Sequence, residues 1–112
     1  MAEREAIVVL VSVPLDDTGD RLARKLVAEG LAACVHQMPA GRSTYRWQGA
    51  VEAAEEILLV IKTTRAAYPA LEAVVRDAHP YDVPEILALA VEEGLPAYVK
   101  WLVDSVTHGS KG

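Results

Sequence analysis

The sequence is poor in cysteine and in long apolar runs, and each shortage excludes a class of protein. Cys34 is the single cysteine among 112 residues, so no disulfide can form within the chain, which fits a reducing compartment. No apolar stretch reaches the roughly 18 residues that a membrane-spanning helix needs. The start of the chain, residues 1–5, is too charged for a signal peptide. We therefore expect a cytoplasmic protein with no membrane partner.

The sequence also lacks an excess of basic residues. It has 11 Lys and Arg against 16 Asp and Glu, for a formal net charge of -5, and the cationic side chains are scattered along the chain. A nucleic-acid-binding surface needs clustered positive charge, so this balance argues against nucleic acid as a partner.

Apolar residues, in contrast, are abundant. They make up 52% of a chain of 112 residues, which is long enough for one domain over residues 1–112 with a single core. A domain of this size leaves much of its surface in water. We therefore expect part of the apolar surface to contact another copy of the chain.

Strand-like and helix-like patterns alternate along the chain. Apolar and β-branched runs predict strands over residues 6–13, 31–38, 43–47, 51–62 and 86–91. Amphipathic spacing predicts helices over residues 20–29, 68–78 and 96–106, the first ended by Gly30. The predicted buried stripe of the second helix is Leu71, Val74, Val75 and Ala78. This order is that of a ferredoxin-like βαββαβ sandwich, an α+β fold, with an extra C-terminal helix.

Residues 43–62 are predicted to form a long β-hairpin arm that turns at residues 48–50. The arm carries Tyr45 and Trp47 near its tip, and it is longer than one small domain can cover. We expect it to reach onto a neighbouring subunit. The polar residues 107–112 are predicted to be a flexible tail.

Residues 79–86, His-Pro-Tyr-Asp-Val-Pro-Glu-Ile, form a polar link between the second helix and the last strand. Pro80 and Pro84 disfavour the helical conformation in the residues before them, so the link is expected to be stiff and extended. The polar side chains that it presents are His79, Tyr81, Asp82 and Glu85. Such a link suits a binding site or a subunit contact.

His79 is a candidate metal ligand, since imidazole suits copper, zinc and nickel. The other donors within the link are Asp82 and Glu85. The alternative is a histidine at a helix end that bonds to backbone or water, and a short motif often has such a structural role. Cys34 lies in an apolar run and is predicted to be a buried thiol that packs like a small hydrophobic residue.

A second set of residues is a candidate ligand cleft or trimer interface. Glu56 and Lys62 have the same parity along one predicted strand, so they lie on one face of it. Aromatic walls with a few polar groups are typical of small-ligand sites, whereas aromatic anchors are equally common at interfaces. The set consists of Tyr45, Trp47, Glu56, Lys62, Tyr81 and Cys34, with Glu85 beside it.

An enzyme would use His79 as the general base, with Asp82 or Glu85 orienting the ring. The sequence contains no nucleophile elbow, no glycine-rich phosphate loop and no HExxH spacing. We therefore expect a protein that is not an enzyme.

Several separate stretches resemble the CutA divalent-cation tolerance family, and they run in order over nearly the whole chain. They are VSVP at 11–14, EGLAACV at 29–35, STYRWQG at 43–49, EILLVIKTT at 56–64, HPYDVPEI at 79–86 and YVKWL at 98–102. The resemblance implies a ferredoxin-like fold, a cytoplasmic homotrimer with interlocked strands, and a role in tolerance of copper and other divalent ions by binding.

The resemblance has two further implications. Copper-binding members have a cysteine and a second histidine where this chain has Val11 and Ala78. The family also shares its architecture with the trimeric PII signalling proteins. The alternative function is therefore a PII-like sensor that binds a small molecule in a cleft between subunits.

Overall fold

The computed structural model describes residues 5–108 of the chain. Within that range it has one sheet of five strands and three helices, which is an α+β fold. The strands are β1 (Ala6–Pro14), β2 (Cys34–Gln37), β3 (Gly41–Trp47), β4 (Ala50–Thr64) and β5 (Ile86–Ala90). The helices are α1 (Thr18–Ala28), α2 (Tyr68–Ala78) and α3 (Pro96–Ser105).

β1 and β4 form the centre of the sheet. The strand order is β2-β4-β1-β5, and neighbouring strands are antiparallel. β1 is paired with β4 along its whole length, from Ala6 opposite Thr64 to Pro14 opposite Glu56. Its run of β-branched residues suits a central strand because such side chains pack well between neighbours on a pleated surface. β3 lies off this path and pairs with β4.

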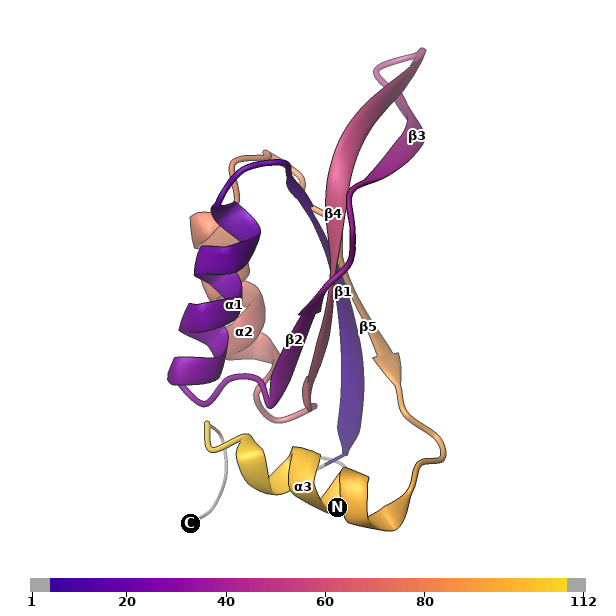
Figure 1. The fold of residues 1–112 in the computed structure, drawn as a ribbon. Helices are drawn as coiled ribbons and strands as arrows, with labels where there is room; N and C mark the ends of the chain where they lie inside the picture. Colours follow the sequence, from indigo (N-terminus) through magenta and orange to yellow (C-terminus); the bar gives the residue numbers. More distant parts are fainter. Residues whose placement is uncertain (1–4, 109–112) are drawn as a thin grey trace.

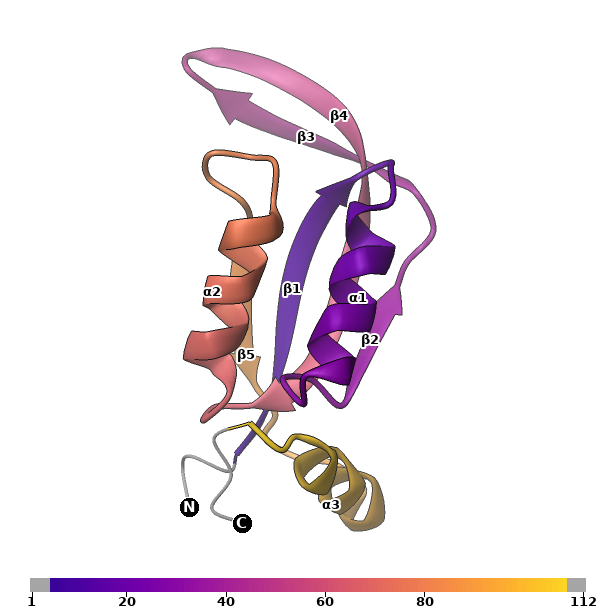
Figure 2. The same ribbon diagram turned by 90° about the vertical axis from the view of Figure 1, so that its left-hand side faces the viewer.

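The two faces of the sheet differ in how they are covered. α1 and α2 lie side by side over one face, whereas α3 lies at the end of the sheet where β1 begins (Figures 1 and 2). The core between the helices and the sheet includes Val9, Val11, Val13, Leu22, Leu26, Leu59, Ile61, Leu71 and Val75. On the opposite, helix-free face, Val8 and Leu10 are half-buried, and Leu87 and Leu89 are 57% and 52% exposed. β1 is therefore fully buried on one face only.

β3 and the first part of β4 form the predicted arm, which projects from the core (Figure 1). Its turn places Gln48 and Gly49 at φ values of 50° and 84°. Two successive residues with positive φ are what a tight two-residue hairpin turn requires, and glycine adopts this conformation without strain. The arm makes the molecule elongated, with principal extents of 46 × 26 × 23 Å.

The predicted order and types of elements are confirmed, but the second strand is shorter than predicted. It covers Cys34–Gln37 and not residues 31–38, because Leu31 and Ala32 instead close the end of α1. Their backbone N–H groups both donate to the carbonyl of Leu26, at 2.9 and 3.2 Å, and their side chains are buried. An apolar pair of this kind is indistinguishable from a strand by periodicity alone.

Two smaller predictions also need correction. Ala78 is exposed, and the buried position at the end of α2 belongs to His79. At the predicted tail, the N–H groups of Thr107 and His108 donate to the carbonyl of Gly30, at 3.1 and 3.0 Å. The rest of that tail, residues 109–112, lies outside the described residues. Over residues 5–108, no helix is long and apolar enough to cross a membrane.

Candidate functional site

His79 anchors the link to the end of β1. It caps α2 with extended backbone angles, φ -81° and ψ 135°, as expected for a residue before proline. Its buried ring bonds through Nε2 to the backbone oxygen of Ser12, at 2.6 Å, and its Nδ1 accepts the N–H of Tyr81, at 3.2 Å. A carbonyl can only accept, so Nε2 carries the proton and the ring is neutral. Both ring nitrogens are therefore engaged.

Tyr81 joins the link to β4. Its hydroxyl donates to Oε2 of Glu56 at 2.9 Å, and its ring centroid lies 4.6 Å from that of His79. Burial, then the hydrogen bond and charge of Glu56, raise the pKa of Tyr81 to about 12, with smaller contributions from Tyr45 and Asp16. The phenol therefore stays protonated at neutral pH and remains a donor to the carboxylate.

Glu85, near the end of the link, is bonded to β1, as His79 is. Its Oε1 accepts a hydrogen bond from Oγ of Ser12 at 3.1 Å, so Ser12 is bonded through its backbone to His79 and through its side chain to Glu85. Asp82 is exposed. Sequence reasoning missed Ser12, although it is the single polar residue of the first predicted strand and a hydroxyl in such a run needs a partner.

Asp16 was also missed, and it lies at the N-terminus of α1 close to this cluster. Its Oδ1 accepts the N–H of Thr18 at 2.8 Å. Hydrogen bonding to Thr18 lowers the pKa of Asp16, and the charge of Arg21 lowers it slightly further. The signal in the sequence is the position of Asp16 just before a predicted helix, where a carboxylate is favoured.

The donors of the link do not fit a metal centre of the predicted design. The described part of the chain contains no group of three or more His, Cys, Asp or Glu side chains that could hold an ion. His79 has no free nitrogen lone pair in this arrangement, and Glu85 is bonded to Ser12. Val11 and Ala78 supply no donor.

The second predicted set shares one face of the sheet but does not converge. Cross-strand pairing places Trp47 opposite Ala50, Tyr45 opposite Glu52 and Cys34 opposite Lys62. Even-numbered β4 residues share a face, so these side chains and Glu56 lie on the helix-free face. They are spread from the tip of the arm to the far end of β4. In the single chain Tyr81 contacts Glu56, whereas Cys34 and Lys62 lie at the far end of β4.

Lys62 and Cys34 belong to the group at the far end. The Nζ of Lys62 lies 5.8 Å from the centroid of Tyr98, whose ring packs against Trp101 at 5.4 Å. Cys34 is half-buried, so the prediction of a buried thiol is wrong. The cause is that Cys34 begins β2, a short strand at the edge of the sheet, and does not lie within a longer one.

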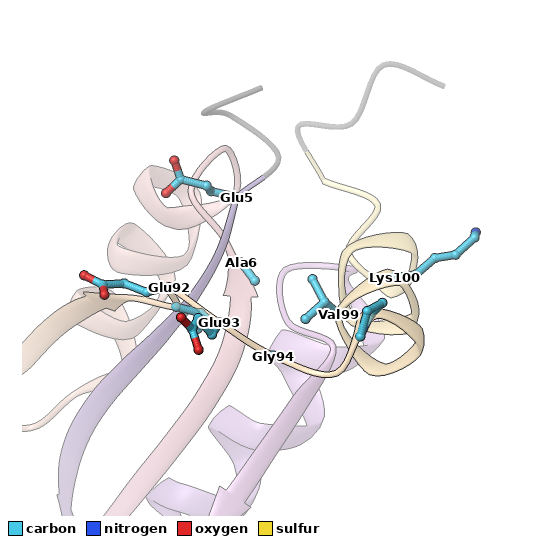
Figure 3. A pocket seen from close by; sticks show the side chains of 9 residues that line it. Glu5, Ala6, Glu92, Glu93, Gly94, Val99 and Lys100 are labelled. Atoms are coloured by element: carbon cyan, nitrogen blue, oxygen red, sulfur yellow. The ribbon is translucent and has the colours of Figure 1, made fainter.

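A surface pocket lies near the same end, between the start of β1 and α3 (Figure 3). It is lined by Glu5, Ala6, Val91, Glu92, Glu93, Gly94, Pro96, Val99 and Lys100. Two of its charged groups have partners elsewhere: Glu5 pairs with Arg65 at 3.1 Å and Lys100 with Asp104 at 2.6 Å. The predicted site residues do not line it.

The fold and the bonded link define an α+β protein with a helix-covered antiparallel sheet and a projecting hairpin. The family model described as "CutA1 divalent ion tolerance protein" matches residues 7–105. The chain belongs to this family.

Individual relatives agree with this assignment. The divalent-cation tolerance protein CutA of Thermus thermophilus is 48% identical over 95 residues, which cover 85% of this chain and 92% of the relative. The solved structure of the Thermus thermophilus protein has a TM-score of 0.88, at 45% identity, and covers 91% of this chain and 99% of that one. CutA1 from Oryza sativa has a TM-score of 0.89, at 41% identity, covering 96% and 99%.

Two comparisons bear on the extent and location of relatives. The chloroplastic CutA 1 protein of Oryza sativa is 44% identical over 100 residues, which cover 89% of this chain and 56% of the rice protein. The structure of CutA from Archaeoglobus fulgidus, described as periplasmic, has a TM-score of 0.87 at 28% identity, covering 91% and 99%. The cytoplasmic location of this chain stays a prediction.

Proposed function

We propose that the protein acts in tolerance of divalent cations, copper among them, as a cytoplasmic homotrimer with a ferredoxin-like fold. It binds its ligand and does not transform it. The observation that carries the proposal is the family match over residues 7–105. The Thermus thermophilus relative, which is named for divalent-cation tolerance, supports it.

The bonding of the link favours binding over catalysis. A general base needs a nitrogen lone pair that can reach a substrate. In His79, Nδ1 accepts the N–H of Tyr81 and Nε2 donates to Ser12, so the ring holds the backbone in place. The carboxylates of Glu56 and Glu85 accept hydrogen bonds from Tyr81 and Ser12.

The exposed apolar side chains favour assembly. On the helix-free face and the arm, Leu87, Leu89 and Val51 are 57%, 52% and 69% exposed, and Trp47 is 44% exposed. Large exposed apolar side chains on a sheet face that no helix covers favour a protein contact. Ligand recognition at the contacts between copies would also explain why the predicted cleft residues are divided between two ends of β4 within one chain.

The test is expression of the chain in a bacterial host that lacks its own family member. The host should recover growth in raised copper or zinc, and a variant with residues 42–55 replaced by a short glycine turn should not restore it. Calorimetry on the purified protein should show saturable copper or zinc binding without turnover. Equal growth with and without the chain would contradict the proposal. The PII-like alternative finds no support in the comparisons; saturable nucleotide binding lost in Trp47→Ala would favour it.

A further inference from the structure

Lys62 is a half-buried cation on the helix-free face of the sheet. It lies between Val8 of β1 and Cys34 of β2, neither of which offers a carboxylate. Its Nζ lies 5.8 Å from the ring centroid of Tyr98, and within residues 5–108 it forms no ion pair. When other copies cover this face, an ammonium without a carboxylate would be left buried, which is costly. The contact between copies therefore has to supply an anion.

The same face carries a carboxylate that has no partner in the described part of the chain. The carboxylates along this face of β4 and just before β5 are Glu52, Glu56 and Glu85. Glu56 and Glu85 already accept hydrogen bonds from hydroxyl groups of the same chain, at 2.9 and 3.1 Å. Glu52 is exposed on the arm, opposite Tyr45, and neither an ion pair nor a side-chain hydrogen bond holds it.

Glu52 and Lys62 cannot meet within one chain. They are ten residues apart on one strand, and at about 3.3 Å per residue this separates them by roughly 30 Å. The pairing of β4 with β3 and β1 runs without a break, so both side chains stay on one face. Figure 1 shows the arm and α3 at opposite ends of the sheet. A bond between these two residues therefore joins two copies.

The two ends are complementary in the way that a ring of three chains requires. In such a ring, one patch of each copy contacts a different patch of the next copy. The arm presents the carboxylate of Glu52 beside the exposed ring of Tyr45. The far end presents the ammonium of Lys62 beside the exposed pair Tyr98 and Trp101. Aromatic residues around a charge pair are typical of the centre of a protein interface.

We propose that Glu52 on the arm of one copy forms an ion pair with Lys62 of the next copy, so that each arm is seated beside α3 of its neighbour. Three equivalent pairs close the ring. This inference rests on the proposed homotrimer, and it adds the residues that join one copy to the next. It does not depend on metal binding.

The experiment is charge reversal on the full chain, with assembly measured by sedimentation equilibrium. Lys62→Glu and Glu52→Lys each place two like charges together, so each should raise the concentration of half-assembly at least about tenfold. The double variant Lys62→Glu/Glu52→Lys restores opposite charges and should recover the trimer. A variant that merely misfolds could not be rescued by a charge on the arm, so this recovery identifies the pair.

Glu55 provides the matched control because it lies on the opposite face of the same arm strand, opposite Arg42. Glu55→Lys should assemble like the wild type and should not rescue Lys62→Glu. A trimeric wild type whose single variants assemble normally, or whose double variant does not recover, would overturn the ion pair and leave the proposed trimer standing. A wild type that sediments as one chain would overturn both.

Discussion

His79 shows how a residue type that is common in metal sites can serve as a structural anchor. Its sequence context left two alternatives open, a metal ligand and a helix-end histidine bonded to the backbone. The second arrangement is the one observed, with the ring between Ser12 and Tyr81. A buried polar ring with both nitrogens satisfied stabilises the fold, because either partner would otherwise be left without a hydrogen bond.

The first prediction follows from this anchoring role. Replacing His79 with alanine should lower the free energy of unfolding by about 2 kcal/mol, because buried hydrogen bonds are lost together with ring packing. The measurement is urea denaturation followed by circular dichroism. The exposed His36 provides the control, and His36→Ala should change the free energy by less than about 0.5 kcal/mol. Equal midpoints for the two variants would contradict the anchoring role.

The raised pKa of Tyr81 gives a prediction at alkaline pH. Below the ordinary value of 10.0 the phenol is protonated in both the folded and unfolded chain, so its contribution to stability is fully present. As the pH rises from 10.0 toward about 12, the unfolded chain loses this proton first and the free energy of unfolding falls. Tyr81→Phe should therefore show a shallower fall over this range, measured by urea denaturation at a series of pH values. Identical slopes would show that burial and Glu56 do not hold the phenol in its neutral form.

At the scale of the element, the sequence predicts most where the signal is local. The β-branched run of β1, the proline at the start of α2 and the glycine turn of the arm each act through their own backbone conformation. The end of α1 could not be placed in this way. Leu31 and Ala32 have the composition of a strand, and only their burial against the core distinguishes them.

The candidate site was predictable to the same extent. The prolines of the link made residues 79–86 recognisable as a stiff polar segment, and the structure gives that segment its bonded partners. The partner of His79, however, lies 67 residues away in the sequence, and no local pattern joins residues so far apart. Whether a histidine binds a metal or a carbonyl is decided by that distant contact.

Gly30 provides a prediction at the junction of α1 with the C-terminal segment. Gly30 and Gly49 both have positive φ, 73° and 84°. A Cβ added at Gly30 would collide with Oγ1 of Thr107, whereas a Cβ added at Gly49 would meet no atom within 4 Å. Gly49→Ala should therefore cost about 1 kcal/mol for backbone strain. Gly30→Ala should cost at least about 2–3 kcal/mol, and adding Thr107→Ala should recover part of that difference. Thermal and urea unfolding measure both, and equal costs would show that Thr107 does not pack against Gly30.

At the scale of the whole molecule, the apolar residues divide into two populations. One fills the core between the sheet and the helices α1 and α2. The other lies on the helix-free face and the arm, where Leu87 and Leu89 are more than half exposed. A single small domain cannot bury the second population, because its surface is large relative to its volume. We therefore expect that contact with other copies both buries this face and fixes the direction of the arm.

The final prediction concerns that contact. Light scattering should give the wild type a mass three times the 12.1 kDa of one chain. Leu89 lies opposite Val8 on the helix-free face, so Leu89→Asp should place a charge inside the contact and shift the protein toward single chains. Its side chain is exposed in the single chain, so circular dichroism should show a retained fold. Val27, 46% exposed on α1, is the matched control, and Val27→Asp should keep the wild-type mass. A wild type that scatters as one chain, or equal masses for the two variants, would mean that the helix-free face is not the contact.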